Sequence, residues 1–170
     1  MSRAFVKEDA SNERIIIPPR ASLPAGTPNY VTPRGMTLLE AELAELTAEL
    51  ERLQASNDDP QRARQLAVIH GRIEGLSDRM ACAEIIDPHT LPQDEVGFGS
   101  VVTIRALSGK FSGEESRLTI VGVDEAELSE GYVAFVAPIA RALLGCKIGE
   151  QAQLTTGDSE QLLEVVTIHW

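Results

Sequence analysis

Two adjacent carboxylates, Asp58 and Asp59, are the residues whose type and spacing most directly suggest chemistry. They stand in segment 55–60, Ala-Ser-Asn-Asp-Asp-Pro, a cluster of turn formers and helix breakers. Mg²⁺ takes hard oxygen ligands and commonly only one or two carboxylates from a protein, so the pair could contribute ligands to a shared Mg²⁺ ion. A structural reading stays open, because Asp59 precedes Pro60 and can cap a following helix, whose dipole also favours acidic residues.

A second candidate lies in segment 138–144, which we expect to form a short helix. Pro138 suits the helix start, Gly145 follows its end, and Ile139 and Arg141 place an apolar side chain and a cation on one turn. The group could anchor a partner. The alternative is that Pro138 only starts the helix, Ile139 fills the core and Arg141 is a solvated charge.

Other chemistry-bearing residues give no site. Cys82 and Cys146 are far apart, with no CxxC or Cys/His spacing around either. The three histidines are scattered and are interpreted as surface residues: His70, His89 and His169. The sequence therefore predicts no metal site, no disulfide framework and no cofactor of the chain's own.

The elements that would position the carboxylates are two amphipathic helices. Apolar residues recur at alternating spacings of three and four, the a/d seam of a coiled coil, first at Met36, Leu39, Leu43, Leu46, Leu50 and Leu53, then at Leu66, Ile69, Ile73, Leu76, Met80 and Ala83. Segment 55–60 separates the two halves. The pattern predicts an antiparallel helical hairpin with Asp58 and Asp59 at its tip, an arm roughly 30 Å long at ~1.5 Å per residue.

The register of the hairpin follows from the seam. Facing residue numbers add to 119, so Leu46 faces Ile73, and the midpoint falls between Asp59 and Pro60. On the flank, Glu42 is expected opposite Arg79, and a second such pair is Glu49 with Arg72. Exposed pairs of this kind contribute only ~0.3–0.5 kcal/mol each, so they select the orientation while the apolar seam supplies the stability.

The rest of the chain divides around this hairpin. Residues 1–31, with four prolines and the apolar run 15–17 (Ile-Ile-Ile), are expected to be a flexible tail, although the run could add an edge strand or cover an apolar patch. Thr32 and Pro33 form a helix start, so the hairpin is assigned to 32–87, a linker to 88–95 and a second module to 96–170. Strands are expected at 101–104, 117–121, 132–135, 151–154 and 162–168. The fold class is α+β: the helical hairpin followed by a small, mainly antiparallel sheet with one short helix.

Composition narrows the partners. A net charge of −11 over 170 residues argues against a general nucleic-acid binder and against docking on anionic lipid. No long apolar run or apolar signal core is present, so we expect a cytoplasmic protein with no membrane contact. A seam satisfied within one chain predicts a monomer. A spacer or dimerising scaffold remains the alternative reading of the hairpin, and sedimentation would reveal it.

Several stretches resemble the bacterial Gre transcript-cleavage factors. The second module matches that family at residues 96–100 (VGFGS), 120–126 (IVGVDEA) and 137–145 (APIARALLG), and the hairpin at 30–35 (YVTPRG), 71–73 (GRI) and 83–87 (AEIID). Segment 137–145 is the most specific match, with Ala137 where the family usually has Ser. The resemblance covers about residues 30–170.

The resemblance implies an FKBP-like C-terminal domain that docks on RNA polymerase while the coiled coil enters the secondary channel. The docking residues it suggests are Asp124, Glu125, Pro138, Ile139 and Arg141. The family's acidic tip motif, similar to GDLSENAEY, which helps hold a second Mg²⁺ against backtracked RNA, is missing. The hairpin is about one heptad shorter in each helix, so Asp58 and Asp59 are at best an analogue of the acidic pair, in possible contact with Mg²⁺ held by the polymerase.

The expected function is therefore modulation of transcription elongation through RNA polymerase, without cleavage stimulation and without enzymatic activity of the chain itself. A short-armed relative, the regulator of nucleoside diphosphate kinase, shares the architecture and binds polymerase without cleavage. Contact with nascent RNA would be indirect, and no sequence-specific DNA binding is expected. The alternatives are a true cleavage factor, whose carboxylates support Mg²⁺-dependent RNA hydrolysis, and an FKBP-type prolyl isomerase, against which the few scattered aromatics weigh.

Overall fold

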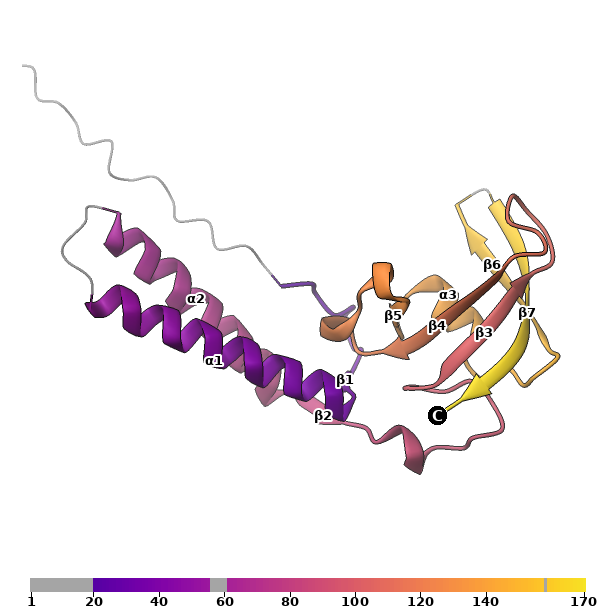
Figure 1. Cartoon of the computed structure of the whole chain (residues 1–170), viewed down its shortest axis with the longest axis horizontal. Coiled ribbons are helices and arrows are strands. Elements are labelled where there is room, and N and C mark those ends of the chain that lie inside the picture. The colour runs from indigo at the N-terminus through magenta and orange to yellow at the C-terminus, as the bar shows by residue number, and fades with distance from the viewer. Residues whose placement is uncertain (1–19, 56–60, 158) are drawn as a thin grey trace, which may run out of the picture.

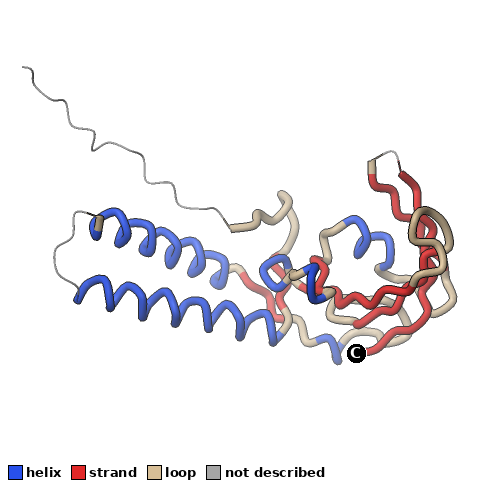
Figure 2. Tube along the Cα trace, turned by 45° about the horizontal axis from the view of Figure 1, so that its top comes forward, coloured by secondary structure: helices blue, strands red, loops and turns tan. Residues whose placement is uncertain are grey.

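A computed structural model describes residues 20–55, 61–157 and 159–170. It shows a two-helix arm that projects from a curled β-sheet module (Figure 1). In the tube view the two helices run side by side along the arm, and the strands of the module curl around one short helix (Figure 2). The α+β class expected from the sequence is confirmed.

The arm consists of α1 (Pro33–Ala55) and α2 (Arg62–Ala81). Its seam is apolar as the heptad pattern predicts: Leu39, Leu46, Ile69 and Leu76 are buried, and Met36, Leu43, Ile73 and Met80 pack against them at partial exposure. Thr32 caps α1, because its Oγ1 accepts the Gly35 N–H at 2.9 Å. One feature differs from expectation: the residue before α2 is Gln61, which makes no side-chain cap bond. The expected cap, Asp59, lies outside the described residues.

The base of the arm contains a pairing that the sequence did not predict. Strand β1 (Asn29–Val31) runs parallel to β2 (Ala83–Ile85), with Tyr30 opposite Glu84. Two expectations are thereby corrected. Residues 29–31 belong to a strand instead of a tail, and Ala83 lies in β2 beyond the end of α2, although it still packs against the seam.

The second module is a five-stranded sheet. All five expected strands are confirmed, and no strand end differs from its expected position by more than three residues. They are β3 (Val101–Ala106), β4 (Glu115–Val121), β5 (Tyr132–Ala134), β6 (Gln151–Thr156) and β7 (Ser159–His169). Their order is β5-β4-β3-β7-β6, antiparallel except for the β4–β5 pair. Short 3₁₀ turns lie at Pro88–Thr90, Val123–Glu125 and Leu128–Glu130, the first of them inside the expected linker.

The core of the module lies between the sheet and α3 (Pro138–Leu143), the short helix expected from the sequence. Val102, Ile120, Leu143 and Val165 are at most 1% exposed and form its centre. Gly145 follows the helix with φ +84°, the left-handed geometry in which glycine ends a helix without steric cost. Among the helices of the described residues, none is both long and apolar enough to cross a membrane.

Candidate functional site

The acidic turn that contains Asp124 lies where the arm meets the sheet module. Asp124 Oδ1 accepts from Arg20 Nε at 3.2 Å, and Arg79 Nε of α2 lies 3.5 Å from Oδ2. The Asp124 side chain is only 5% exposed. Arg20 also binds the Glu42 carboxylate of α1 with two nitrogens at 2.9–3.0 Å, and this hydrogen bonding is the main reason that the pKa of Arg20 is raised. One arginine from the N-terminal segment therefore bridges the arm and the module.

Glu125 makes the second contact across this boundary. Thr32 Oγ1 donates to its Oε2 at 2.5 Å, and Arg34 Nη1 donates to its Oε1 at 2.7 Å. The Thr32 hydroxyl thus donates its hydrogen to Glu125, and its oxygen accepts the Gly35 N–H to cap α1. A Cβ at Gly35 would lie 2.7 Å from Glu125 Oε2, so a larger residue there would force the Glu125 carboxylate to move. The start of α1 and the module are joined through one buried carboxylate.

Aromatic side chains also pack across the boundary between the arm and the sheet module. The Tyr30 ring of β1 lies 6.0 Å from Phe98 and 5.6 Å from Phe135, centroid to centroid. A Cβ at Gly122 would lie 2.4 Å from the Tyr30 carbonyl oxygen, so this contact also requires glycine. We call the whole boundary the joint; it consists of Arg20, Tyr30, Thr32, Arg34, Glu42 and Arg79 on the arm side and Phe98, Gly122, Asp124, Glu125 and Phe135 on the module side.

Two of the candidate docking residues lie in the joint. The sequence suggests Asp124 and Glu125 as polymerase contacts, and the structure places both carboxylates against residues of the chain itself. Glu42 and Arg79 do not pair with each other as expected, because Arg20 is the ion-pair partner of Glu42 and Arg79 faces Asp124. The sequence interpretation treated the segment around Arg20 as a tail without contacts.

The three candidates on α3 have different exposures. Pro138 and Arg141 are exposed, whereas Ile139 is half-buried and packs against the core. Ala137, before the helix, makes no side-chain cap bond. The structure therefore separates the proposed anchor into an exposed pair and a residue that also supports the fold.

A groove of about 300 Å³ lies beside α3. Its floor is apolar, and it is lined by Ile104, Ala106, Phe111, Glu114, Ser116, Leu118, Ile139, Gln161 and Leu163. Phe111 is the only aromatic residue in that lining, because Phe98 and Phe135 pack in the joint. The lining gives no support to a prolyl isomerase site built on aromatic rings.

The tip carboxylates Asp58 and Asp59 lie outside the described residues. At the neighbouring end of the arm, the Arg62 side chain donates to the backbone oxygens of Leu53 at 2.9 Å and Gln54 at 2.7 Å. It thereby satisfies carbonyls at the end of α1 that have no partner within the helix. Within 20–55, 61–157 and 159–170, no group of three or more His, Cys, Asp or Glu side chains is placed to hold a metal.

Comparison with known proteins shows which family this chain resembles. Residues 91–169 match the family model described as "Transcription elongation factor, GreA/GreB, C-term". The protein named transcription elongation factor GreA from a Nitratiruptor species is 33% identical over 138 residues, which cover 78% of this chain and 83% of the relative. The Rickettsia felis protein of the same name is 35% identical over 156 residues, 82% of this chain and 93% of the relative.

Among solved structures, Gfh1 of Thermus aquaticus is similar at 24% identity. The alignment covers 84% of this chain and 99% of Gfh1, with a TM-score of 0.40. The family model spans the sheet module, and the GreA relatives extend the match across most of the chain at one third identity. The chain therefore belongs to the GreA/GreB family of transcription elongation factors.

Proposed function

We propose that this protein binds bacterial RNA polymerase, inserts its arm into the secondary channel and modulates elongation without supplying carboxylates for RNA cleavage. Its relatives are named transcription elongation factors. The 23 residues of α1 give an arm of about 35 Å at 1.5 Å per residue, narrow enough to enter a channel. Such a protein would act in the bacterial cytoplasm as a monomer and would meet nascent RNA only inside the polymerase.

The joint is the observation that carries the proposal. An arm that buries only its own seam needs a fixed direction if it is to thread a channel while the other module stays outside. The buried Glu125 carboxylate, bound by Thr32 and Arg34, and the Tyr30 ring between Phe98 and Phe135 supply that direction. The sheet module would dock at the channel rim, and the joint would aim the arm inward.

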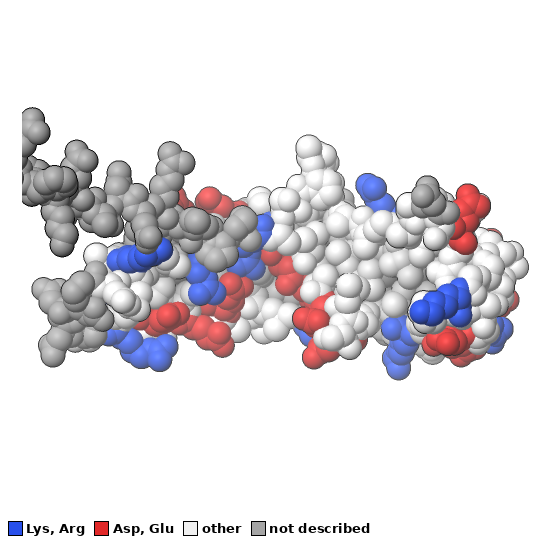
Figure 3. Space-filling view, turned by 90° about the horizontal axis from the view of Figure 1, so that it is seen from above, with Lys and Arg blue, Asp and Glu red and all other residues white. Residues whose placement is uncertain are grey.

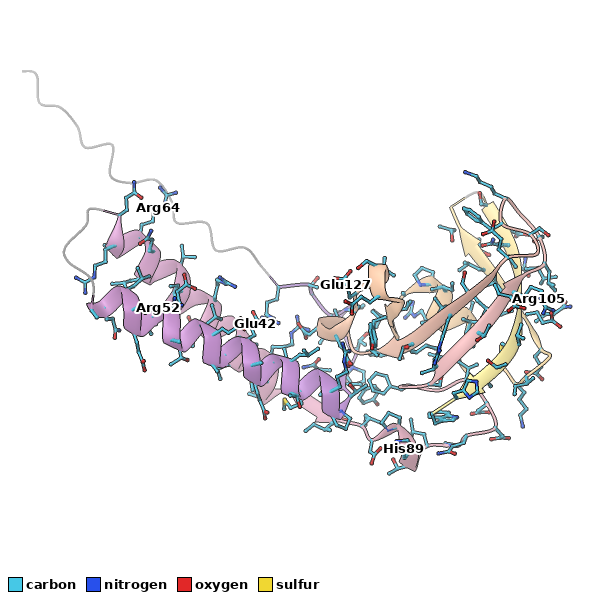
Figure 4. All side chains as sticks on the ribbon, in the orientation of Figure 1. Glu42, Arg52, Arg64, His89, Arg105 and Glu127 are labelled. Carbon is cyan, nitrogen blue, oxygen red and sulfur yellow. The ribbon has the colours of Figure 1, made fainter. Side chains whose placement is uncertain are left out.

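The charge near the tip supports a non-catalytic role. Arg52, Arg62 and Arg64 lie at the described ends of the two helices, next to segment 56–60 (Figure 4 labels Arg52 and Arg64). Figure 3 shows basic side chains beside that end of the arm. Cations at this position oppose the approach of Mg²⁺ by charge repulsion. We therefore propose that these carboxylates serve the turn and not a metal.

Docking is expected to depend on Arg141. Its guanidinium is exposed on α3 beside the exposed Pro138, whereas Ile139 packs against the core and would report on folding as well as binding. Arg141→Glu should weaken binding to core RNA polymerase at least tenfold, about 1.4 kcal/mol, mainly through faster dissociation. The measurement is a competition titration on polymerase, paired with a thermal melt of each free variant.

Arg117→Glu is the matched control, because Arg117 is exposed on β4 and alternates with Leu118, which packs against the core. It should leave the affinity unchanged. If Arg141→Glu binds like the unaltered protein and melts at the same temperature, α3 is not the anchor. If the unaltered protein does not bind core polymerase at all, the proposed function is wrong.

A further inference from the structure

Strand β6 forms one edge of the five-stranded sheet, and β5 forms the other. Strand β5 has three residues and lies beside the joint, whereas β6 has six residues and lies on the side of the sheet away from the arm (Figure 1). The register of β6 with β7 is unbroken over all six residues. A regular edge of this length presents a row of backbone N–H and C=O groups with which another strand can pair.

The hydrogen bonds to β7 show which backbone groups of β6 point outward. Just before the strand, the Val165 N–H donates to the Glu150 oxygen at 2.9 Å, so these two residues form a hydrogen-bonded pair. Bonded and non-bonded pairs alternate along an antiparallel ladder. Gln151, Gln153 and Thr155 therefore direct both of their backbone groups away from β7.

The neighbouring ladder agrees with this alternation. Leu162 lies opposite Gln153 and directs its backbone groups to the far side of β7. Its oxygen accepts the Leu107 N–H and its N–H donates to Ser108 Oγ, both at 2.8 Å. In the part of the chain that the structure describes, the outward N–H and C=O groups of β6 have no hydrogen-bond partner.

The side chains of β6 do not protect this edge. Sheet edges are commonly shielded from other chains by lysine, by proline, by a bulge or by a very short strand. Strand β6 reads Gln-Ala-Gln-Leu-Thr-Thr, with neither a charge nor a proline. Gln151, Gln153 and Thr155 are exposed, and such neutral polar side chains can lie opposite one another across two strands without repulsion.

We propose that β6 pairs with β6 of a second copy of this chain, antiparallel about a two-fold axis at Gln153. Gln151 of one copy then lies opposite Thr155 of the other, and Gln153 lies opposite its own counterpart. The outward N–H and C=O groups of all three residues gain partners in this register, because outward-pointing residues face one another. The contact uses the same surface on both copies, so it closes as a dimer and does not extend into a fibre.

The dimer would leave the arm of each copy uncovered. The joint lies beside β5, at the opposite edge of the sheet, so the two arms would project from the two ends of the joined sheets (Figure 1). Three facing residue pairs bury less than the roughly 800 Å² per partner of a standard interface, so we expect a weak dimer that depends on concentration. The dimer and the monomer that would act on polymerase are then two states of one equilibrium. The proposal rests on the sheet edge and does not depend on the proposed function.

Charge substitution at Gln153 tests the pairing, because this residue faces its counterpart across the axis. In the full-length protein, Gln153→Lys and Gln153→Glu should each raise the dissociation constant of the dimer at least tenfold, since like charges directly opposite each other are destabilising. An equimolar mixture of the two variants should recover the dimer, because opposite charges then face each other. The measurement is sedimentation velocity over a series of protein concentrations up to about 1 mM, paired with a thermal melt of each variant.

Gln54→Lys and Gln54→Glu are the matched controls, because Gln54 is an exposed glutamine near the far end of α1. Both should leave the dissociation constant unchanged. A monomer at every concentration of the unaltered protein would overturn the proposal. A dimer that both Gln153 variants leave intact would also overturn it and place the contact on another surface, and loss of the dimer without recovery in the mixture would overturn the two-fold register. Loss in each variant with recovery in the mixture would confirm the pairing.

Discussion

Replacing Glu125 with alanine is expected to release the arm from the sheet module. The substitution removes a carboxylate that is 3% exposed and accepts from Thr32 at 2.5 Å and Arg34 at 2.7 Å. It leaves the Thr32 hydroxyl without its acceptor and Arg34 without its ion pair, and losing one member of such a set costs roughly 2–4 kcal/mol. The opening free energy measured by amide hydrogen exchange should fall by that amount at the start of α1 and in β1. Strands β3 and β7 should keep their protection.

Two further variants show whether the loss belongs to this carboxylate. Glu125→Gln keeps an oxygen acceptor for Thr32 but loses the charge that faces Arg34. Its hydrogen exchange at the start of α1 should therefore be faster than in the unaltered protein and slower than in Glu125→Ala. Glu127→Ala removes an exposed glutamate two residues away, whose side chain accepts from Ser129, and should have no effect on exchange in α1. If Glu125→Ala leaves exchange at the base of α1 unchanged, the joint does not hold the arm.

Leu46→Ala should loosen the arm without unfolding the sheet module. Leu46 is 3% exposed in the middle of the seam, and removing a buried leucine side chain typically costs about 2–4 kcal/mol in lost burial and cavity formation. Leu38→Ala is the control on the same helix, since Leu38 is 44% exposed and should cost well under about 1 kcal/mol. Urea titration followed by helix circular dichroism and by Trp170 fluorescence separates the arm from the module.

The same substitution tests the register of the seam. A double-mutant cycle of Leu46→Ala with Ile73→Val should show coupling of at least about 0.5 kcal/mol, because the register places the two side chains in contact. A cycle of Leu46→Ala with Met80→Ala, one heptad away from Ile73, should be additive. Coupling of Leu46 to Met80 and not to Ile73 would show that the register is shifted by a heptad.

The elements predicted well from the sequence are those with a sustained apolar periodicity or with residues that mark their ends. Six apolar residues in each half of the hairpin define the seam, and Thr32 with Pro33 marks the start of α1 by the chemistry of the cap itself. The five strands of the module were recognisable as short strand-forming runs separated by Gly-containing turns. The short helix α3 is marked at its ends by Pro138 and Gly145.

The joint could not be predicted from the sequence, because it is built from very short segments that lie far apart in the chain. Strand β1 has three residues, too few to show a period, and its partner β2 lies beyond the whole arm. Arg20 and Asp124 are 104 positions apart, so no local pattern links them. An acidic turn such as Asp124–Glu125 has the same sequence whether it faces solvent or lies buried, and only the fold decides which.

The length of labelled nascent RNA in stalled elongation complexes tests most directly whether the arm modulates RNA polymerase without RNA cleavage. The unaltered protein and an Asp58→Asn, Asp59→Asn variant are compared in the presence of Mg²⁺, because asparagine caps a helix about as well as aspartate but is a poorer Mg²⁺ ligand. We expect both proteins to leave RNA length unchanged and to alter the rate of subsequent elongation equally. Mg²⁺-dependent shortening of the RNA by the unaltered protein, lost in the double variant, would instead make the chain a cleavage factor.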